Sequence, residues 1–428
     1  MKFYSTNQQS EAVSFKDAVI KSLPSDRGLY YPEEVPELDF LFVETLDYYS
    51  LPDIGIEILR QFTKTDLPED KLEEIVKDAL DFEIPVKEVE KGISTLELFH
   101  GPTYAFKDVG ARFLARCLGY FNETENKEVT ILVATSGDTG GAVASGFYNV
   151  PGVNVVILYP SGKVSPLQEK QLTTLGGNIR ALEVQGNFDD CQAMVKRAFL
   201  DVSINQKLNL SSANSINIAR WLPQSIYYFE AFKQLKDKEK VVFSVPSGNY
   251  GNITAGMLAK KMGLPIHRFI AASNANDIVP RYLQDGNYEI KPTVATLSNA
   301  MDVSDPSNHP RMLELHDKVF KDIVKDTEGF SLNDEQTLEV MKACHTANGY
   351  ILDPHGAIAY QGLKEKLQKK ETGVFLETAH YSKFLSTVEQ ALDQKMELPD
   401  FVSDLMSKEK VATPINNDYE EFKAFLLG

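Results

Sequence analysis

The segment Leu96–Phe121 places one lysine at the start of a predicted helix. Leu96–Phe99 is typical of a short buried strand, and the apolar residues after Phe106 recur at helical spacing. Lys107 therefore lies in the first helical turn, where unpaired backbone N–H groups and the positive end of the helix dipole disfavour an ammonium charge. A lysine whose pKa is lowered in this way can form Schiff bases. The alternative is a surface lysine paired with Asp108.

Two further segments, Val129–Phe147 and Val241–Leu258, are each typical of a strand, a glycine-rich turn and a helix. Their turns are Thr135–Gly141 and Pro246–Asn252. Glycine lets the backbone approach a ligand closely, so the turn N–H groups and the following helix dipole can hold a phosphate or carboxylate. Neither turn matches the dinucleotide pattern G-x-G-x-x-G or the nucleoside-triphosphate pattern G-x-x-x-x-G-K-[ST]. Two such turns, both rich in Ser, Thr and Asn, indicate that two anionic groups are held.

Several segments together resemble the fold-type II pyridoxal-phosphate enzymes, and specifically the threonine synthase family. The segments are Glu97–Asp108 (cofactor lysine), Ala134–Gly140 (substrate carboxylate), Val245–Gly251 (cofactor phosphate), Asn209–Asn217, Leu297–Val303 and Asp26–Pro32. They follow the family order and span most of the chain. Position 138 is Asp, as in the long-chain bacterial and fungal members, whereas many relatives of the wider superfamily carry Asn.

The resemblance implies roles for individual residues. Lys107 would hold pyridoxal phosphate as a Schiff base and act as the general base for the substrate Cα proton. The other implied cofactor-binding residues are Asp138, Gly248, Asn249, Tyr250, Gly251, Asn252 and Thr378. The implied substrate-carboxylate residues are Ser136, Gly137 and Thr139. Asp138 is expected near the phenolic oxygen of the cofactor, where two anionic oxygens would share a proton. Thr378 is expected against the pyridine nitrogen.

A phosphorylated substrate requires a second anion site, and two segments could supply it. Ser165 lies near the N-cap of a predicted helix, with Lys163 beside it. Asn214 and Ser215 precede Arg220, whose planar guanidinium suits phosphate oxygens. The alternative for the lysine and the arginine is a solvated or salt-bridged surface position.

The resemblance implies conversion of O-phospho-L-homoserine and water to L-threonine and phosphate. A related phospholyase that releases 2-oxobutyrate would share the motifs, and a serine or threonine dehydratase would lack the need for phosphate-binding groups at Lys163 and Arg220. A noncatalytic anion-binding protein would have no use for Lys107. A product assay and the cofactor absorbance distinguish these alternatives.

Composition restricts the partners. The 428 residues carry a formal net charge of −17, which argues against a nucleic-acid-binding surface. No stretch approaches the roughly 20 apolar residues of a membrane span, and the N-terminus lacks the apolar core of a signal peptide, so we expect a cytoplasmic protein. The scattered residues Cys117, Cys191 and Cys344 indicate neither disulfides nor a zinc site, and the histidines show no metal-binding spacing, so no metal is expected. The long N-terminal segment resembles that of monomeric family members.

The order of the predicted elements indicates an α/β protein with two lobes. Strands alternate with helices from Leu96 to Leu222 and again from Val241, which predicts open parallel sheets of the fold-type II (tryptophan synthase β-like) kind. We expect a mainly helical N-terminal domain over residues 1–95, one α/β lobe over 96–240 and another over 241–428. Ala272–Asp305 is predicted to be a long functional loop, and Leu392–Gly428 a helical tail.

Overall fold

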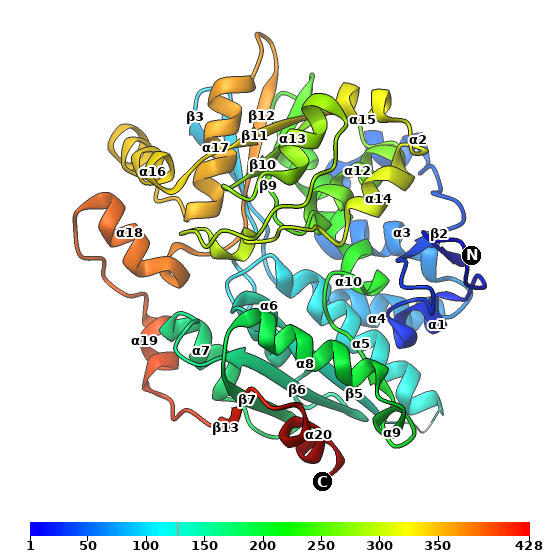
Figure 1. The fold of residues 1–428 in the computed structure, drawn as a ribbon. Coiled ribbons are helices and arrows are strands. Elements are labelled where there is room, and N and C mark those ends of the chain that lie inside the picture. Colours follow the sequence, from blue (N-terminus) through cyan, green and yellow to red (C-terminus); the bar gives the residue numbers. More distant parts are fainter. Residues whose placement is uncertain (126–127) are drawn as a thin grey trace.

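The computed structural model describes residues 1–125 and 128–428, which form two lobes, one above the other in Figure 1. The lower lobe contains a five-stranded parallel sheet in the order β13-β7-β6-β5-β8. Its strands are β5 (Val129–Ala134), β6 (Val153–Pro160), β7 (Ile179–Gln185), β8 (Leu210–Ser211) and β13 (Thr413–Asn416). Its helices are α5 (Lys107–Glu125), α6 (Asp138–Phe147), α7 (Pro166–Thr173), α8 (Phe188–Leu200), α9 (Val202–Asn205), α19 (Asp400–Ser407) and α20 (Tyr419–Leu427).

The upper lobe contains a six-stranded sheet in the order β11-β10-β9-β12-β4-β3, parallel except for the β3–β4 pair. Its strands are β3 (Val86–Glu90), β4 (Ile93–Glu97), β9 (Val241–Pro246), β10 (Ile266–Ser273), β11 (Thr327–Ser331) and β12 (Thr372–Glu377). Its helices are α11 (Ile226–Gln234), α12 (Gly251–Lys261), α13 (Ile278–Asp285), α14 (His309–Leu315), α15 (Phe320–Asp326), α16 (Asp334–Asn348), α17 (Pro354–Lys366) and α18 (Leu385–Leu392). Two parallel-sheet lobes confirm the predicted fold class.

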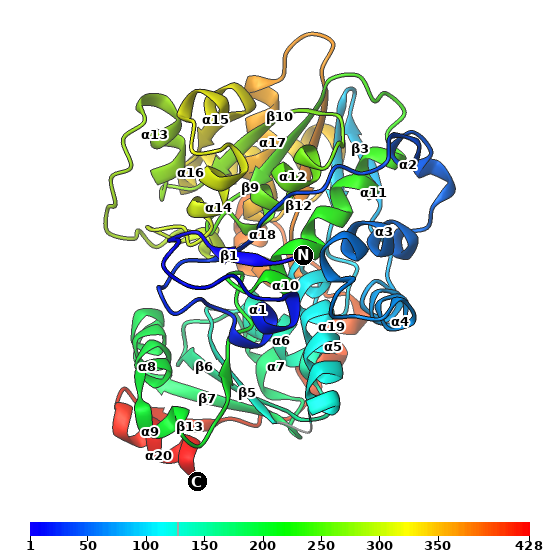
Figure 2. The same cartoon turned by 90° about the vertical axis from the view of Figure 1, so that its right-hand side faces the viewer.

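The N-terminal segment lies beside the junction of the lobes, as Figure 2 shows. It contains the antiparallel strands β1 (Phe3–Ser5) and β2 (Tyr30–Pro32) and the helices α1 (Phe15–Lys21), α2 (Phe40–Glu44), α3 (Leu51–Thr63) and α4 (Glu69–Ala79), with the 3-10 turn η1 (Leu46–Tyr48). The Ser22 hydroxyl bonds to that of Ser211 in the lower lobe (2.6 Å), and the Leu38 N–H donates to the carbonyl of Met262 in the upper lobe. The segment is therefore tied to both lobes.

Sheet membership does not follow the boundaries expected at residues 95 and 240. β3 and most of β4 precede residue 96, yet they complete the upper sheet, because the β4 backbone pairs in parallel with β12. The predicted helical tail contains β13, which pairs with β7 and so returns the chain to the lower lobe. Both differences arise from pairing between segments far apart in the sequence, which local periodicity does not report.

The aromatic segment 218–232 is packed core. It is divided into α10 (Ile218–Trp221), the 3-10 turn η2 (Leu222–Ser225) and α11, because Pro223 cannot donate to a helical ladder. Trp221, Tyr227 and Phe229 are fully buried, and the Trp221 indole N–H donates to Thr254 Oγ1 at 3.0 Å. The described part of the chain contains no helix long and apolar enough to cross a membrane.

Strand ends from both lobes provide the segments singled out in the sequence. β5 ends at Ala134 and β9 at Pro246, each immediately before its glycine-rich turn. β12 ends just before Thr378, and β4 ends ten residues before Lys107. Because ligands of parallel α/β sheets are met at the carboxyl ends of strands, this is the edge on which to look for a site.

Candidate functional site

Lys107 is the first residue of α5, and the loop before it is held at several points. Asp108 accepts from the Thr103 N–H (2.8 Å) and the Thr103 hydroxyl (2.6 Å), and the Phe106 N–H donates to the Thr378 carbonyl (2.9 Å). Tyr104 adopts a left-handed φ of 58° within this loop. The Lys107 side chain is only 16% exposed, and Asp108 is occupied by Thr103. The alternative of a surface lysine paired with Asp108 is therefore wrong.

The surroundings of Lys107 make its amine easier to deprotonate. Burial lowers the pKa of Lys107 to about 8, and the nearby cations of Lys383 and Arg220 act in the same direction. Asp138 opposes them, with its Oδ2 atom 3.8 Å from Lys107 Nζ. With this pKa, about half of the amine is neutral at pH 8 and about a tenth at pH 7, and the neutral form is the one that Schiff-base formation and proton abstraction require.

Asp138 begins α6 and is buried. Burial alone would raise the pKa of Asp138, but the ammonium groups of Lys383 and Lys107 hold it well below its usual range. The Oδ1 atom lies 2.8 Å from Lys383 Nζ and accepts from Gln168 Nε2 at 2.9 Å. Lys383 and Gln168 were not identified from the sequence. Lys383 follows Thr378 by five residues, so only its nearness to a predicted site segment could have signalled it.

The turn between β5 and α6 depends on glycine and on one threonine. Gly137 has φ 145°, and a Cβ there would lie 2.4 Å from Gln168 Cδ. Thr135 Oγ1 accepts from the N–H groups of Gly137 and Gly140, both at 3.0 Å. Ser136 lies just before α6, and Thr139 lies in the first turn of α6. Both residues are partly exposed. The N–H groups at a helix start lack partners within the helix, so this turn can receive a carboxylate.

The turn between β9 and α12 is similarly constrained. A Cβ on Gly248 would lie 2.5 Å from Met301 Cα, so only glycine fits there. Tyr250 caps α12 in the left-handed conformation, and its hydroxyl bonds to Ser273 Oγ at 2.7 Å. Asn252 accepts from the Tyr228 hydroxyl at 2.7 Å, which leaves its buried Nδ2 without a partner among the described residues. The N–H groups at the start of α12 lack partners within the helix, and together with this free amide they are available to bind an anion.

Asn249 and Ser215 are brought together from different parts of the chain. Asn249 Nδ2 donates to Ser215 Oγ at 2.6 Å, and Asn308 Nδ2 donates to the Asn249 carbonyl at 3.0 Å. Arg311 donates to the Ser215 carbonyl (2.9 Å) and to Asn308 Oδ1 (2.8 Å). Arg311 is fully buried beneath these residues, with its guanidinium carbon 4.5 Å from the Trp221 ring centre. It was not identified from the sequence because its segment carries no glycine-rich turn.

Arg220 and Lys163, predicted for the same anion, lie in different environments. Arg220 is buried, donates through Nη1 to the Ala213 carbonyl, and has a buried Nε with no partner among the described residues. Burial lowers the pKa of Arg220 to about 10, and the group still carries its charge at neutral pH. A surface position is therefore wrong for Arg220. Lys163 is exposed, and no described contact joins it to Arg220.

The remaining predicted residues have mixed surroundings. Ser165 is the N-cap of α7 and forms a capping box with Gln168, which in turn holds Asp138. Asn214 is partly exposed and precedes Ser215 at the start of the turn into α10. Thr378 is largely buried directly after β12. Their roles toward a ligand stay predictions.

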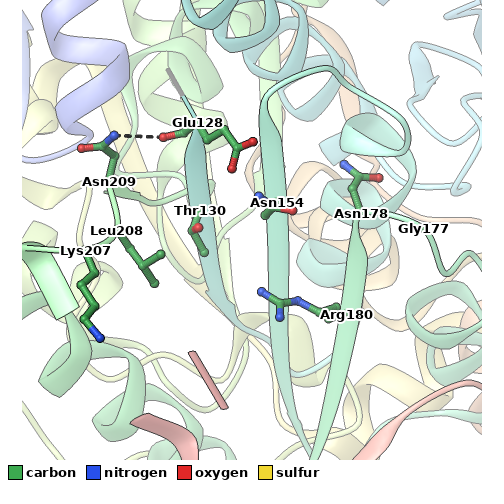
Figure 3. Close-up of a pocket in the computed structure, with 9 residues that line it drawn as sticks. All are labelled: Glu128, Thr130, Asn154, Gly177, Asn178, Arg180, Lys207, Leu208 and Asn209. Atoms are coloured by element: carbon green, nitrogen blue, oxygen red, sulfur yellow. Dashed lines mark hydrogen bonds between the residues drawn. The ribbon is translucent and has the colours of Figure 1, made fainter. Parts of the chain in front are cut away.

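A hollow of about 390 Å³ lies at the opposite edge of the lower sheet (Figure 3). Its lining residues are Glu128, Thr130, Asn154, Gly177, Asn178, Arg180, Lys207, Leu208 and Asn209. Thr130, Asn154 and Arg180 stand near the beginnings of β5, β6 and β7, whereas the Asp138 turn follows the end of β5. This hollow is separate from the Lys107 site. Residues 1–125 and 128–428 contain no group of His, Cys, Asp and Glu side chains arranged to hold a metal ion.

The Lys107 site fits pyridoxal phosphate. The amine with a lowered pKa suits the aldehyde, and the cradle at Gly248 and Asn252, with its free amide, suits the phosphate. The neutral hydroxyl of Thr378 lies directly after the end of β12, at the sheet edge that carries the other site residues. The arrangement thus matches both the reactive and the anionic parts of this cofactor.

Comparisons with known proteins agree with this chemistry. Residues 91–378 match the family model described as "Pyridoxal-phosphate dependent enzyme", residues 2–80 match "Threonine synthase N terminus" and residues 356–426 match "Threonine synthase, C-terminal". The threonine synthase of Haemophilus influenzae is 48% identical over 429 residues, covering 100% of both chains. The Escherichia coli threonine synthase structure (TM-score 0.93, 45% identity) covers 100% of this chain and 99% of that one.

A pyridoxal-phosphate-bound threonine synthase from Brucella melitensis has a TM-score of 0.94 at 35% identity and covers 100% of this chain and 98% of that one. The predicted dependence on pyridoxal phosphate is confirmed, as is the predicted family. The chain belongs to the threonine synthase family of pyridoxal-phosphate-dependent lyases.

Proposed function

We propose that this chain converts O-phospho-L-homoserine and water to L-threonine and phosphate. The observation that carries the choice of a phosphorylated substrate is Arg220. Its guanidinium is buried near Lys107, remains charged and keeps one Nε–H group unpartnered. Asp108 is the nearby anion that raises the pKa of Arg220, but no described ion pair joins the two groups. A buried cation that lacks a directly bonded anion is costly, and a substrate phosphate would supply that bond.

Two further anionic groups, the substrate carboxylate and the cofactor phosphate, are each assigned to one glycine-rich turn. The turn at Gly137, with Ser136 and Thr139, is proposed to hold the substrate carboxylate. The turn at Gly248 and Asn252, with Asn249, Tyr250 and Gly251, is proposed to hold the cofactor phosphate. Ser215, which follows Asn214 in the chain, accepts a hydrogen bond from Asn249, and this contact supports a substrate phosphate bound close to the cofactor phosphate. Lys163 and Ser165 are proposed at the periphery of that subsite.

Proton transfer is assigned to Lys107. Bound pyridoxal phosphate supplies an electron sink that stabilises negative charge on the substrate carbons. The Lys107 amine takes the Cα proton and is able to release it again, because burial and neighbouring cations lower its pKa to about 8. The N–H groups before α6 hold the substrate carboxylate, and Arg220 holds the phosphate that leaves from Cγ. The Thr378 hydroxyl is proposed to face the pyridine nitrogen without protonating it.

The experiment is a product assay with O-phospho-L-homoserine, combined with borohydride reduction and peptide mass spectrometry. We expect threonine and phosphate in equal amounts, with the reduced cofactor attached to Lys107. Release of 2-oxobutyrate in place of threonine would identify a phospholyase, and turnover of unphosphorylated serine or threonine alone would identify a dehydratase. The variant K107A should lose turnover while retaining its fold. Cofactor attached to another lysine would overturn the assignment.

We also propose a monomer that acts in the cytoplasm. The N-terminal segment bonds to both lobes of its own chain, which supports a protein whose lobes are held together without a second subunit. Cys117, Cys191 and Cys344 are buried and unpaired, as is usual in a reducing compartment. Sedimentation equilibrium of the holoenzyme at micromolar concentrations tests the first proposal; a dimer would contradict it.

A further inference from the structure

A second lysine is buried beside Lys107, and none of the binding roles above requires it. Lys383 lies in the 3-10 turn η4 (Tyr381–Phe384), just after the end of β12, and its side chain is 0% exposed. Its ammonium group lies 2.8 Å from Asp138 Oδ1 and donates to the Thr103 carbonyl at 2.8 Å. A fully buried ammonium group is costly unless it is paired, so this position demands an explanation.

Asp138 is shared unequally between two lysines. Its Oδ1 atom receives Lys383 at 2.8 Å and Gln168 Nε2 at 2.9 Å, whereas its Oδ2 atom is 3.8 Å from Lys107. Attraction falls with distance, so Lys383 is the principal counter-ion of this carboxylate. Without Lys383, Asp138 would have to pair with Lys107, and that pairing would keep Lys107 protonated.

We propose that Lys383 is a positioning residue that holds Asp138 as a carboxylate and thereby frees the Lys107 amine to give up its proton. The inference rests on the proposed role of Lys107 as the cofactor-binding base. It assigns to Lys383 no contact with the substrate. The lysine acts through Asp138 and through its own positive charge, which disfavours a second ammonium group close by.

The neighbouring charges agree with this assignment. The groups that face Lys107 are Asp138 from α6, Lys383 from η4 and Arg220 from α10. Lys383 and Arg220 lower the pKa of Lys107, and Asp138 raises it. His380 precedes η4, and burial lowers its pKa to about 4, so it adds no charge at neutral pH.

Asp108 also faces Lys383, but it is already bonded to Thr103. The loop that carries Lys107 is thus anchored at Thr103 from two sides, since its N–H and hydroxyl bind Asp108 and its carbonyl binds Lys383 and Gln171. Replacing Lys383 with Gln retains a donor for this carbonyl and removes only the charge.

The test measures the titration of Lys107 in the full-length protein freed of cofactor, so it does not depend on which substrate is turned over. A limiting amount of an amine-acylating reagent is added at a series of pH values, and labelling of Lys107 is followed by peptide mass spectrometry. We expect K383Q to raise the apparent pKa of Lys107 by about one unit or more, which reduces labelling near pH 7 about tenfold. D138N should shift it in the opposite direction, and D138N/K383Q should return toward the original value.

Two controls separate the charge effect from general damage. K383R retains the cation and should leave the pKa of Lys107 nearly unchanged. K233Q removes another partly buried lysine, paired with Glu230 at 2.6 Å in α11, and should have no effect on Lys107. An unchanged Lys107 titration in folded K383Q would overturn the proposal.

If K383Q does not fold, D138N is compared with D138N/K383Q, in which the buried pair is replaced by two neutral groups. The direct effect of Lys383 predicts a lower Lys107 pKa in D138N than in the double variant. Equal values would overturn the proposal. If the unmodified protein makes no threonine but K383Q still shows the expected rise in the Lys107 pKa, only the proposed function is contradicted.

Discussion

At the scale of single residues, burial determines which charged groups contribute to the site. Lys107, Asp138 and Arg220 are largely removed from water, so each of their charges is felt strongly by the others. Lys163, which was also predicted to bind the substrate phosphate, is exposed, and water screens its charge. The two cations predicted for one phosphate should therefore differ in their contribution to binding.

This difference is testable by substitution. R220M should raise KM for O-phospho-L-homoserine about tenfold to a hundredfold, because a charge-assisted bond to the phosphate is lost. K163Q should change KM less than about threefold, as expected for a screened surface charge. Initial rates and the cofactor absorbance are measured for both variants. Equal changes of KM in the two variants would show that Arg220 does not bind the substrate phosphate directly.

Thr378 provides a second prediction at this scale. A neutral hydroxyl leaves the pyridine nitrogen unprotonated, whereas a carboxylate would hold a proton there and strengthen the electron sink. T378D should therefore lower threonine output about tenfold or more and increase abortive transamination, measured as 2-oxo acid and aminated cofactor. T378S keeps the hydroxyl and should resemble the unmodified protein. Unchanged product ratios in T378D would mean that Thr378 does not contact the ring.

At the scale of elements, the end of β12 meets the start of α17 through an acid pair. Glu377 Oε1 accepts from the Asp353 N–H at 2.8 Å, and Asp353 caps α17 and bonds to His355 Nδ1 at 2.5 Å. Burial raises the pKa of Glu377 well above its usual range, and the adjacent Asp353 carboxylate raises it further. The raised pKa favours the protonated form of Glu377, and its bond to the Asp353 N–H helps to fix the strand end preceding Thr378.

This acid pair predicts a pH dependence of stability. The folded-state pKa of Glu377 lies above its unfolded value, so its stabilising contribution is complete below about pH 4.3 and is lost as pH rises toward the folded-state pKa. E377Q cannot ionise and supplies an amide donor to Asp353. We expect E377Q to gain stability relative to the unmodified protein between pH 5 and pH 8, on the order of 1 kcal/mol. Urea denaturation of both proteins at pH 5 and at pH 8 measures this difference in unfolding free energy. An equal loss of stability with pH in E377Q and in the unmodified protein would contradict the assignment.

At the scale of the whole molecule, the chain crosses between the lobes more than once. The C-terminal residues leave the upper lobe after α18 and end in the lower lobe at β13 and α20 (Figure 1). On the way, Phe401 of α19 stacks on Tyr104 in the loop before Lys107, with ring centres 3.8 Å apart. The tail therefore covers the edge strand β7 and also contacts the site loop.

The tail should accordingly contribute to global stability. Ile415 of β13 is buried in the lower core, so I415A should reduce the free energy of unfolding by roughly 2–5 kcal/mol. V411A, at a residue that is 60% exposed just before this strand, should change it by less than about 0.5 kcal/mol. Denaturant unfolding of both variants with saturating cofactor measures the difference. Similar small effects would show that β13 is not part of the cooperative core.

Local sequence was sufficient for the elements whose signals are local. The strand-turn-helix segments at Gly137 and Gly248 are predicted because the apolar period and the glycines lie within about twenty residues, and the structure places both turns at strand ends. The helix start at Lys107 is likewise a local property. The family resemblance added the roles of the individual residues, which the spacing alone does not provide.

Only the tertiary structure decided which charges meet. Lys383 and Arg311 carry no local motif, and the capping box of Gln168 reports only the start of a helix. Each of the three is nevertheless buried against a predicted residue, because separate segments of the chain pack together. The placement of β4 and β13 follows the same rule, since their partners lie about 280 and 230 residues away in sequence. Periodicity reports the face that a residue presents, whereas burial of a charge and its partner depends on what packs against that face.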